Sequence, residues 1–233
     1  MRFQPLGDQA IRVQFGQDVE FRTHQDIRQF CLTLERRQVP AIIEWVPSYT
    51  AVTIYYDLSL CTYEEMKEKL QKIMKKVEGE ELPPPRIVEV PTCYGDDLGP
   101  DLETVAHHNG LKPDEVIALH SEGEYIVYML GFSPGFPYLG GLHPRLATPR
   151  LASPRAVTPA GSVGIAGEQT GIYSIETPGG WQIIGRTPLS LYDPYRKDPT
   201  LFQMGDIVKF VPISKRVYEE IKVKGYKAGG GYA

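Results

Sequence analysis

Residues 131–188 decide the fold of this chain and read GFSPGFPYLGGLHPRLATPRLASPRAVTPAGSVGIAGEQTGIYSIETPGGWQIIGRTP. Glycine and proline recur every few residues, yet aromatic and branched apolar side chains fill the gaps between them. A flexible linker lacks such apolar side chains. Glycine permits positive φ and close backbone approach, whereas proline fixes φ. We therefore expect this stretch to form a rigid, shaped surface.

Short strands separated by turn signals favour a β-barrel or a β-sandwich for this part of the chain. Residues 125–130 form a strongly β-prone segment just before the stretch, and residues 207–211 form another after it. Within the stretch, residues 173–177 and 181–187 flank Pro178-Gly179-Gly180. A proline–glycine turn between two apolar segments predicts a β-hairpin there.

The N-terminal part of the chain alternates candidate strands and helices, which predicts a small α/β domain. Residues 10–15 alternate apolar and polar side chains, as a half-buried strand does, and residues 42–46 and 51–56 are two more candidate strands. Residues 20–37 carry apolar side chains at the i, i+3, i+4, i+7 spacing of one helix face. A second helix is expected to begin at Thr62, where a glutamate three residues later completes a capping box.

Three consecutive prolines at residues 83–85 predict a stiff, extended connector between two domains. We therefore predict a small α/β domain at residues 1–82 and a β-rich domain at residues 83–233. The chain as a whole is then of the α+β class.

Composition excludes several classes of function. The 233 residues carry a formal net charge of -4, which provides no general attraction to nucleic acid or to an anionic membrane. No apolar run is long enough for a transmembrane helix, and the N-terminus has no continuous apolar segment of a secretory signal. The three cysteines are widely separated and odd in number, which favours reduced thiols in a cytoplasmic protein.

Two glycine motifs of the stretch are weak evidence for catalysis or nucleotide binding. Residues 131–135 match the G-x-S-x-G pattern of serine hydrolases, but Pro134 lacks the N–H that the oxyanion hole needs. Residues 161–167 read G-x-x-G-x-x-G, which is not the dinucleotide fingerprint, and the sequence has no phosphate-loop motif. His107 and His108 are adjacent on an expected helix and cannot form an H-x-x-x-H metal pair, so no metal site is predicted.

Arginine is the most informative charged residue of the stretch. Arg150 and Arg155 each follow a proline, and Arg186 lies in an expected strand. The planar guanidinium is suited to carboxylate or phosphate, and a rigid backbone would hold it in place. Structural pairing with a glutamate is an equally good interpretation of these arginines. His120, at the end of an expected helix, is either a hydrogen-bonded structural residue or an acid–base group.

Several segments together resemble one protein family. They are GFSPGFPYLGGL (131–142), the two Pro-Arg pairs (149–155), PAGSVGIAG (159–167), PGGW (178–181) and IIGRTP (183–188). With GDQAIRVQFG near the N-terminus and GDIVKF near the C-terminus, they span nearly the whole chain in the same order. The sequence is similar to the KipI/PxpB family, also called allophanate hydrolase subunit 1.

The resemblance implies a fold, an activity and partners. It implies that the second domain is a cyclophilin-like β-barrel. It also implies that the chain is the B subunit of an ATP-dependent 5-oxoprolinase, which converts 5-oxo-L-proline to L-glutamate with PxpA-like and PxpC-like (KipA-like) subunits. The chain alone would be inactive, and ATP with Mg²⁺ would bind mainly to the partner subunits. The alternatives are inhibition of a sporulation histidine kinase, or a role related to urea amidolyase and allophanate hydrolase.

Residue chemistry within these segments suggests a site shared with a partner subunit. We expect one groove of the barrel to contain four residues that act on the reacting groups: His120, Arg150, Arg155 and Arg186. Four more residues of the same region are expected to contact substrate or partner: Phe136, Tyr138, Gln169 and Trp181.

Overall fold

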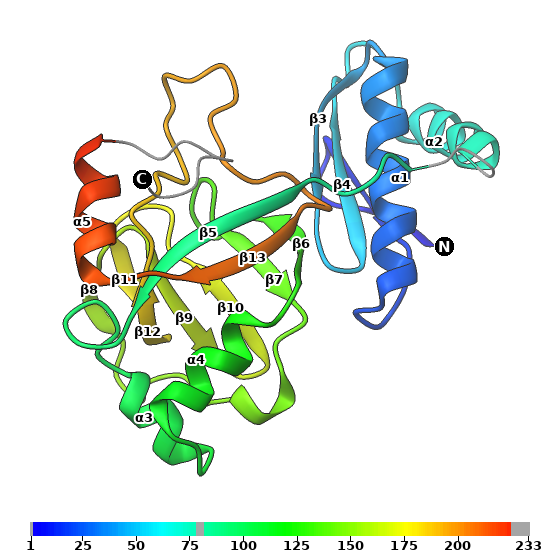
Figure 1. Cartoon of the computed structure of the whole chain (residues 1–233). Helices are drawn as coiled ribbons and strands as arrows, with labels where there is room; N and C mark the ends of the chain where they lie inside the picture. Colours follow the sequence, from blue (N-terminus) through cyan, green and yellow to red (C-terminus); the bar gives the residue numbers. More distant parts are fainter. Residues whose placement is uncertain (1, 78–81, 225–233) are drawn as a thin grey trace. The chain divides into compact units, whose positions relative to one another are not determined.

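The computed structural model describes residues 2–77 and 82–224 and divides the chain into two compact units, Met1–Pro84 and Pro85–Ala233 (Figure 1). Each unit has its own set of buried apolar residues. The division lies within two residues of the boundary expected from the prolines at 83–85.

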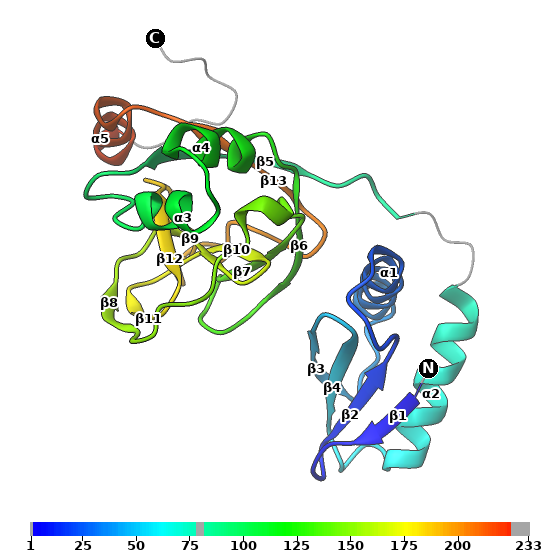
Figure 2. The same ribbon diagram turned by 90° about the horizontal axis from the view of Figure 1, so that it is seen from below.

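The N-terminal unit is a four-stranded antiparallel sheet, with strand order β1-β2-β4-β3, and two helices on one face (Figure 2). In β4, Val52, Ile54 and Tyr56 are buried, whereas the alternate residues Thr53 and Tyr55 are more exposed. The core of this unit therefore lies on one face of the sheet. The elements are β1 (Arg2–Pro5), β2 (Ala10–Gln14), α1 (Phe21–Arg37), β3 (Ile42–Pro47), β4 (Ala51–Tyr56) and α2 (Tyr63–Val77).

Both helices of this unit form where the sequence predicts them. The buried stripe of α1 contains Ile27, Phe30 and Leu34, in agreement with the spacing of its apolar residues. The capping box before α2 is confirmed, because Thr62 N–H donates to Glu65 Oε2 at 2.8 Å and Glu65 N–H donates to Thr62 Oγ1 at 3.4 Å.

The C-terminal unit is a closed barrel with strand order β10-β7-β6-β13-β5-β12-β9. Only β5 and β13 pair in parallel among these described strands. The elements are β5 (Ile87–Tyr94), α3 (Leu102–His108), α4 (Pro113–Ser121), β6 (Tyr125–Leu130), β7 (Pro137–Gly140), the 3₁₀ helix η1 (Pro144–Leu146), β8 (Arg155–Thr158), β9 (Ser162–Ala166), β10 (Gln169–Ile172), β11 (Thr177–Gly179), β12 (Gln182–Arg186), β13 (Ile207–Pro212) and α5 (Lys215–Lys224).

The hairpin predicted around Pro178-Gly179-Gly180 is wrong. Residues 177–179 form β11, which pairs with β8 in a separate two-stranded ribbon, while β12 pairs with β9 and β5 in the barrel. The ring of Tyr173 lies against Gly179, where an added Cβ would come within 2.3 Å of its hydroxyl oxygen. Glycine is therefore needed at 179 for this close approach, rather than for a two-strand turn.

The α+β class is confirmed, and the alternative of a sandwich is replaced by the closed barrel. Closure gives every barrel strand two neighbours, so the barrel has no free sheet edge among its described strands. The parallel pair begins at an ion pair: Arg86 Nε donates to Asp206 Oδ1 at 3.1 Å, and its Nη2 donates to Asp206 Oδ2 at 2.5 Å. Asp206 Oδ2 also accepts the N–H of Gln203 at 2.7 Å.

Replacement of Asp206 by alanine should destabilise the barrel by about 2 kcal/mol, because a buried, bidentate acceptor is lost and a backbone N–H loses its partner. Urea unfolding in a Trp45→Phe background, in which Trp181 is the fluorescent reporter, would measure the change. Glu64→Ala, which removes an exposed ion pair with Lys67, is the matched control and should leave the midpoint unchanged. Equal midpoints for the two variants would contradict this role of Asp206.

Candidate functional site

An aromatic groove lies on the barrel unit and brings together four of the residues expected from the sequence. Phe136, Tyr138, Arg150 and Trp181 all line it, and its cavity has a volume of about 290 Å³. The complete lining comes from segments that are distant in the sequence: Phe132, Phe136, Tyr138, Arg150, Pro154, Tyr173, Pro178, Gly179, Gly180 and Trp181.

Phe136 is the centre of the groove wall. Its ring centroid lies 5.1 Å from that of Tyr138 and 5.5 Å from those of Tyr173 and Trp181, each in an edge-to-face arrangement. Edge-to-face pairs add to the stability that burial already provides. Gly171 of β10 makes this packing possible, because a Cβ there would meet Phe136 at 3.0 Å and Trp181 at 3.1 Å. The wall is therefore a rigid apolar surface.

Arg150 places a positive charge on this wall. Its guanidinium carbon lies 6.0 Å from the ring centroid of Trp181, within the range of a cation–π contact. Among the residues that the structure describes, no carboxylate forms an ion pair with Arg150, and its side chain is exposed. The guanidinium is consequently available to an anionic or carbonyl group that enters the groove.

Phe132 and Tyr173 also line the groove, and the sequence reasoning missed both. Phe132 is 65% exposed and has a φ of 63°, a left-handed conformation that is unusual for an aromatic residue. Its ring contacts Phe136 and Tyr173 edge-to-face, at centroid distances of 5.5 and 6.5 Å. An exposed aromatic ring held in a strained backbone conformation is often part of a binding surface. The quoted motif contains both residues, but no local pattern distinguishes them from core aromatics.

Arg155 does not line the groove, but it contacts the backbone of Trp181, which does. Its Nη2 donates to Asp101 Oδ1 at 2.6 Å, and its Nη1 donates to the carbonyl of Trp181 at 3.2 Å. The other oxygen of Asp101 accepts the N–H of Ile183 at 2.6 Å. The pairing interpretation is therefore correct for Arg155, although its partner is an aspartate. The ion pair therefore fixes the backbone from Trp181 to Ile183.

His120 lies in the barrel core and not in the groove. It is fully buried, and its ring packs on Phe210 at a centroid distance of 4.4 Å. Thr170 Oγ1 donates to the carbonyl of Gly164 at 3.0 Å, so it accepts from His120 Nε2 at 2.9 Å. The Nδ1 atom then accepts from the Tyr94 hydroxyl at 2.8 Å. Burial lowers the pKa of His120 to about 3, which keeps the ring neutral.

Arg186 and Gln169 are not among the groove residues either. Arg186 ends β12, where its Nε donates to the carbonyl of Ala160 at 2.8 Å. Gln169 begins β10 opposite Ala166 of β9. The expected single cluster is therefore corrected: Arg150, Phe136, Tyr138 and Trp181 come together, whereas His120, Arg155, Arg186 and Gln169 occupy other positions.

Within residues 2–77 and 82–224, no group of three or more His, Cys, Asp or Glu side chains could hold a metal ion. No helix among these residues is both long enough and apolar enough to span a membrane.

Comparison with known proteins defines the class of protein. Residues 1–202 match the family described as carboxyltransferase domain, subdomain C and D. The chain therefore belongs to this family. The KipI/PxpB resemblance within it is confirmed by relatives that are named as the B subunit of 5-oxoprolinase. The Bacillus subtilis relative is 45% identical over 95% of this chain and 96% of its own length. The Escherichia coli O157:H7 relative is 43% identical over 89% of this chain and 94% of its own length.

Solved structures agree with this assignment. The crystal structure of TTHA0988 is 35% identical and superposes with a TM-score of 0.79, covering 88% of this chain and 40% of that chain. PH0987 from Pyrococcus horikoshii is 42% identical with a TM-score of 0.56, covering 93% of this chain and all of that chain. Urea amidolyase of Saccharomyces cerevisiae is a more distant relative, 24% identical over 91% of this chain and 13% of that protein.

Because His120 is neutral in the folded chain, the free energy of unfolding should depend on pH. Between the ordinary pKa of 6.5 and the native value of about 3, the unfolded chain binds a proton that folded His120 does not. Stability is therefore fully present above pH 6.5 and falls as the pH is lowered, by up to about 1.4 kcal/mol per pH unit. Burial also lowers the pKa of His24 to about 4, with the same sign.

Urea midpoints measured from pH 5 to 7.5 would test this expectation. His120→Gln should reduce the slope of stability against pH, whereas His107→Gln, on the exposed side of α3, should leave the slope unchanged. An unchanged slope in His120→Gln would show that the ring is not the proton-binding group.

Proposed function

We propose that this chain is the B subunit of an ATP-dependent 5-oxoprolinase, a cytoplasmic complex that opens 5-oxo-L-proline to L-glutamate. The observation that carries the proposal is the similarity to relatives named as that subunit, at 38–45% identity over most of each chain. The urea amidolyase relative is only 24% identical, so a urea-related activity has weaker support. Kinase inhibition, which the KipI/PxpB resemblance also implies, stays a prediction.

The aromatic groove supports a substrate-binding role in that complex. 5-Oxo-L-proline combines a flat five-membered lactam with a carboxylate. We infer that the lactam packs on the wall formed by Phe136 and Trp181, while Arg150 binds the carboxylate or the charge that develops on the amide oxygen. The rigid wall would hold the amide in one orientation while the reaction occurs.

The remaining parts of the reaction are assigned to the partner subunits. Lactam opening driven by ATP needs phosphate-binding groups and Mg²⁺ ligands, and this sequence has no phosphate-loop motif. We propose that PxpA-like and PxpC-like (KipA-like) subunits hold most of the ATP and Mg²⁺. The groove would then complete a site with a partner surface, and the chain alone would be inactive.

Arg150→Ala should reduce kcat/KM of the reconstituted complex by about 100-fold, because a preorganised cation is lost from the reacting groups. The measurement is ATP-dependent release of glutamate from 5-oxo-L-proline by this chain co-purified with the other two subunits. Arg145→Ala, an exposed arginine of the same stretch outside the groove, is the control and should retain full activity.

Two outcomes would contradict the proposal at different levels. Full activity of an assembled complex with Arg150→Ala would remove the groove arginine from the mechanism. Absence of glutamate release from the wild-type complex, at any ATP concentration, would overturn the 5-oxoprolinase assignment itself.

A further inference from the structure

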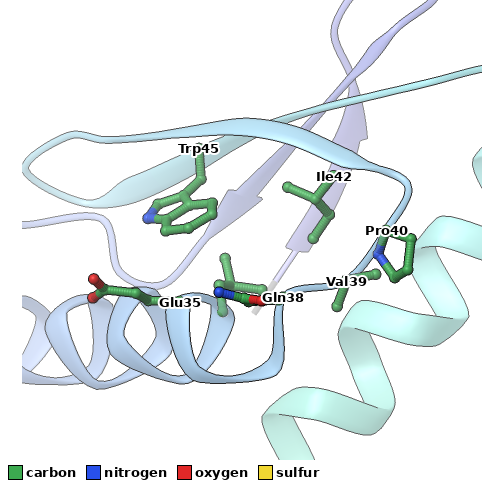
Figure 3. Close-up of a pocket in the computed structure, with 7 residues that line it drawn as sticks. Glu35, Gln38, Val39, Pro40, Ile42 and Trp45 are labelled. Atoms are coloured by element: carbon green, nitrogen blue, oxygen red, sulfur yellow. The ribbon is translucent and has the colours of Figure 1, made fainter.

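A second hollow lies in the N-terminal unit, between the C-terminal end of α1 and the strand β3. Its volume is about 360 Å³. Figure 3 shows Trp45 and Ile42 pointing from β3 toward the helix, with Glu35 and Gln38 below them and Pro40 at the far end. The buried side chain of Leu34 also lines the hollow. It is therefore mostly apolar, with one carboxylate beside an indole ring.

The strand that borders this hollow is an edge of its sheet. In the order β1-β2-β4-β3, the strand β3 has one neighbour only among the described strands. Its backbone can therefore pair with another extended segment on the open side. The register shifts between Ile42 and Glu44, so regular pairing with β4 runs from Glu44 to Pro47. Pro47 has no N–H, which leaves Glu44 to Val46 as the part of the edge most suited to pairing.

β3 carries apolar side chains on both of its faces. Ile42 and Trp45 face the hollow, while Ile43 is 66% and Val46 40% exposed. A solvent-exposed edge strand ordinarily has charged residues that discourage association, and here Glu44 is the sole charged residue of the strand. An apolar edge beside an apolar hollow is typical of a surface that another chain covers.

The charges at this edge indicate what kind of segment fits. Glu35 and Glu44 are both exposed, and no ion pair joins either carboxylate to another described residue. Arg36 and Arg37 follow Glu35 at steps of about 100° around α1, so their side chains leave the helix from other sides than the one that carries Glu35. The carboxylate of Glu35, which lines the hollow with Trp45, favours a basic side chain there, because such a side chain can form an ion pair and also stack on the indole. Glu44 adds a second negative charge on the other face of the strand.

These charges argue against a symmetric pair of identical chains. Antiparallel pairing of Glu44 to Val46 with the same segment of a second copy places the two Glu44 side chains on one face as diagonal neighbours, where their like charges repel each other. A different chain with a basic residue has no such repulsion.

We propose that β3 and the hollow beside it are a docking surface for an extended, basic and apolar segment of another subunit of the complex. This inference rests on the proposed function, which supplies such subunits. The segment adds a strand along Glu44 to Val46, inserts an apolar side chain against Ile42 and Trp45, and places a Lys or Arg by Glu35.

Tryptophan fluorescence can test this docking surface separately from the groove, because the chain has two tryptophans and each lines a different hollow. Trp181→Phe leaves Trp45 as the reporter, and Trp45→Phe leaves Trp181. Purified PxpA-like and PxpC-like subunits are titrated into each variant. Trp45 emission should shift to shorter wavelength on binding. In the Trp181→Phe background, Glu35→Lys with Glu44→Lys should weaken the binding that produces this shift at least tenfold.

The control substitution is Glu68→Lys, on an exposed face of α2, which should leave the affinity unchanged. If Trp181→Phe fails to fold, a photo-crosslinking amino acid at exposed position 46 of the wild-type chain provides the same test. It should attach to another subunit, whereas the same group at Val223, exposed on α5, should not.

The outcomes separate this inference from the proposed function. An active complex in which Trp45 emission does not change, or in which position 46 does not crosslink, overturns the docking surface alone. A shift that depends only on the concentration of this chain also overturns it, in favour of a second copy. If the complex releases no glutamate and the emission of Trp45 and Trp181 does not change when the other subunits are added, both proposals are overturned.

Discussion

The ion pair between Asp101 and Arg155 is the interaction on which the groove depends. Asp101 Oδ1 holds Arg155 at 2.6 Å, its Oδ2 accepts the N–H of Ile183, and its own N–H donates to the Ile183 carbonyl at 2.8 Å. One carboxylate at the start of α3 thus joins the ribbon strand β8 to the barrel strand β12. Gly99 permits the approach, because a Cβ there would overlap the carbonyl of Ile184. With the backbone next to Trp181 fixed in this way, the aromatic wall is formed before any ligand binds.

The same interaction explains why the arginines of the stretch differ in role. Arg155 is paired with a buried carboxylate and donates to a backbone carbonyl, so its charge is already compensated. Arg150, five residues earlier and also preceded by proline, has a ring as its neighbour instead of an acid. A cation on an aromatic face retains its hydrogen-bonding capacity for a ligand. The two Pro-Arg dipeptides therefore provide one structural and one available guanidinium.

This difference shows where sequence reasoning succeeds and where it ends. The helix stripes and the capping box at Thr62 depend on residues close in sequence, and they were predictable. Short strands and dense turn signals favoured a barrel or a sandwich, and only the family resemblance implied the barrel that the structure contains. By contrast, the partner of Arg155 is 54 residues away, and the Thr170 that satisfies His120 is 50 residues away. The pairing of β11 with β8 instead of β12 is also nonlocal. Which arginine is available to a ligand, and which histidine is buried, are properties of these distant contacts.

Each unit has a tryptophan that lines a hollow and lies near a charged side chain, and the charge has the opposite sign in the two units. Trp181 lies beside the cation of Arg150, whereas Trp45 lies near the carboxylate of Glu35. The two hollows therefore favour ligands of opposite charge: an anion on the barrel and a cationic side chain on the sheet. Because electrostatic complementarity suppresses wrong partners more than it adds affinity, opposite preferences keep the two surfaces from competing for one ligand. Under the two proposals above, a small anionic substrate and a basic segment of another subunit would bind to different surfaces of the same chain.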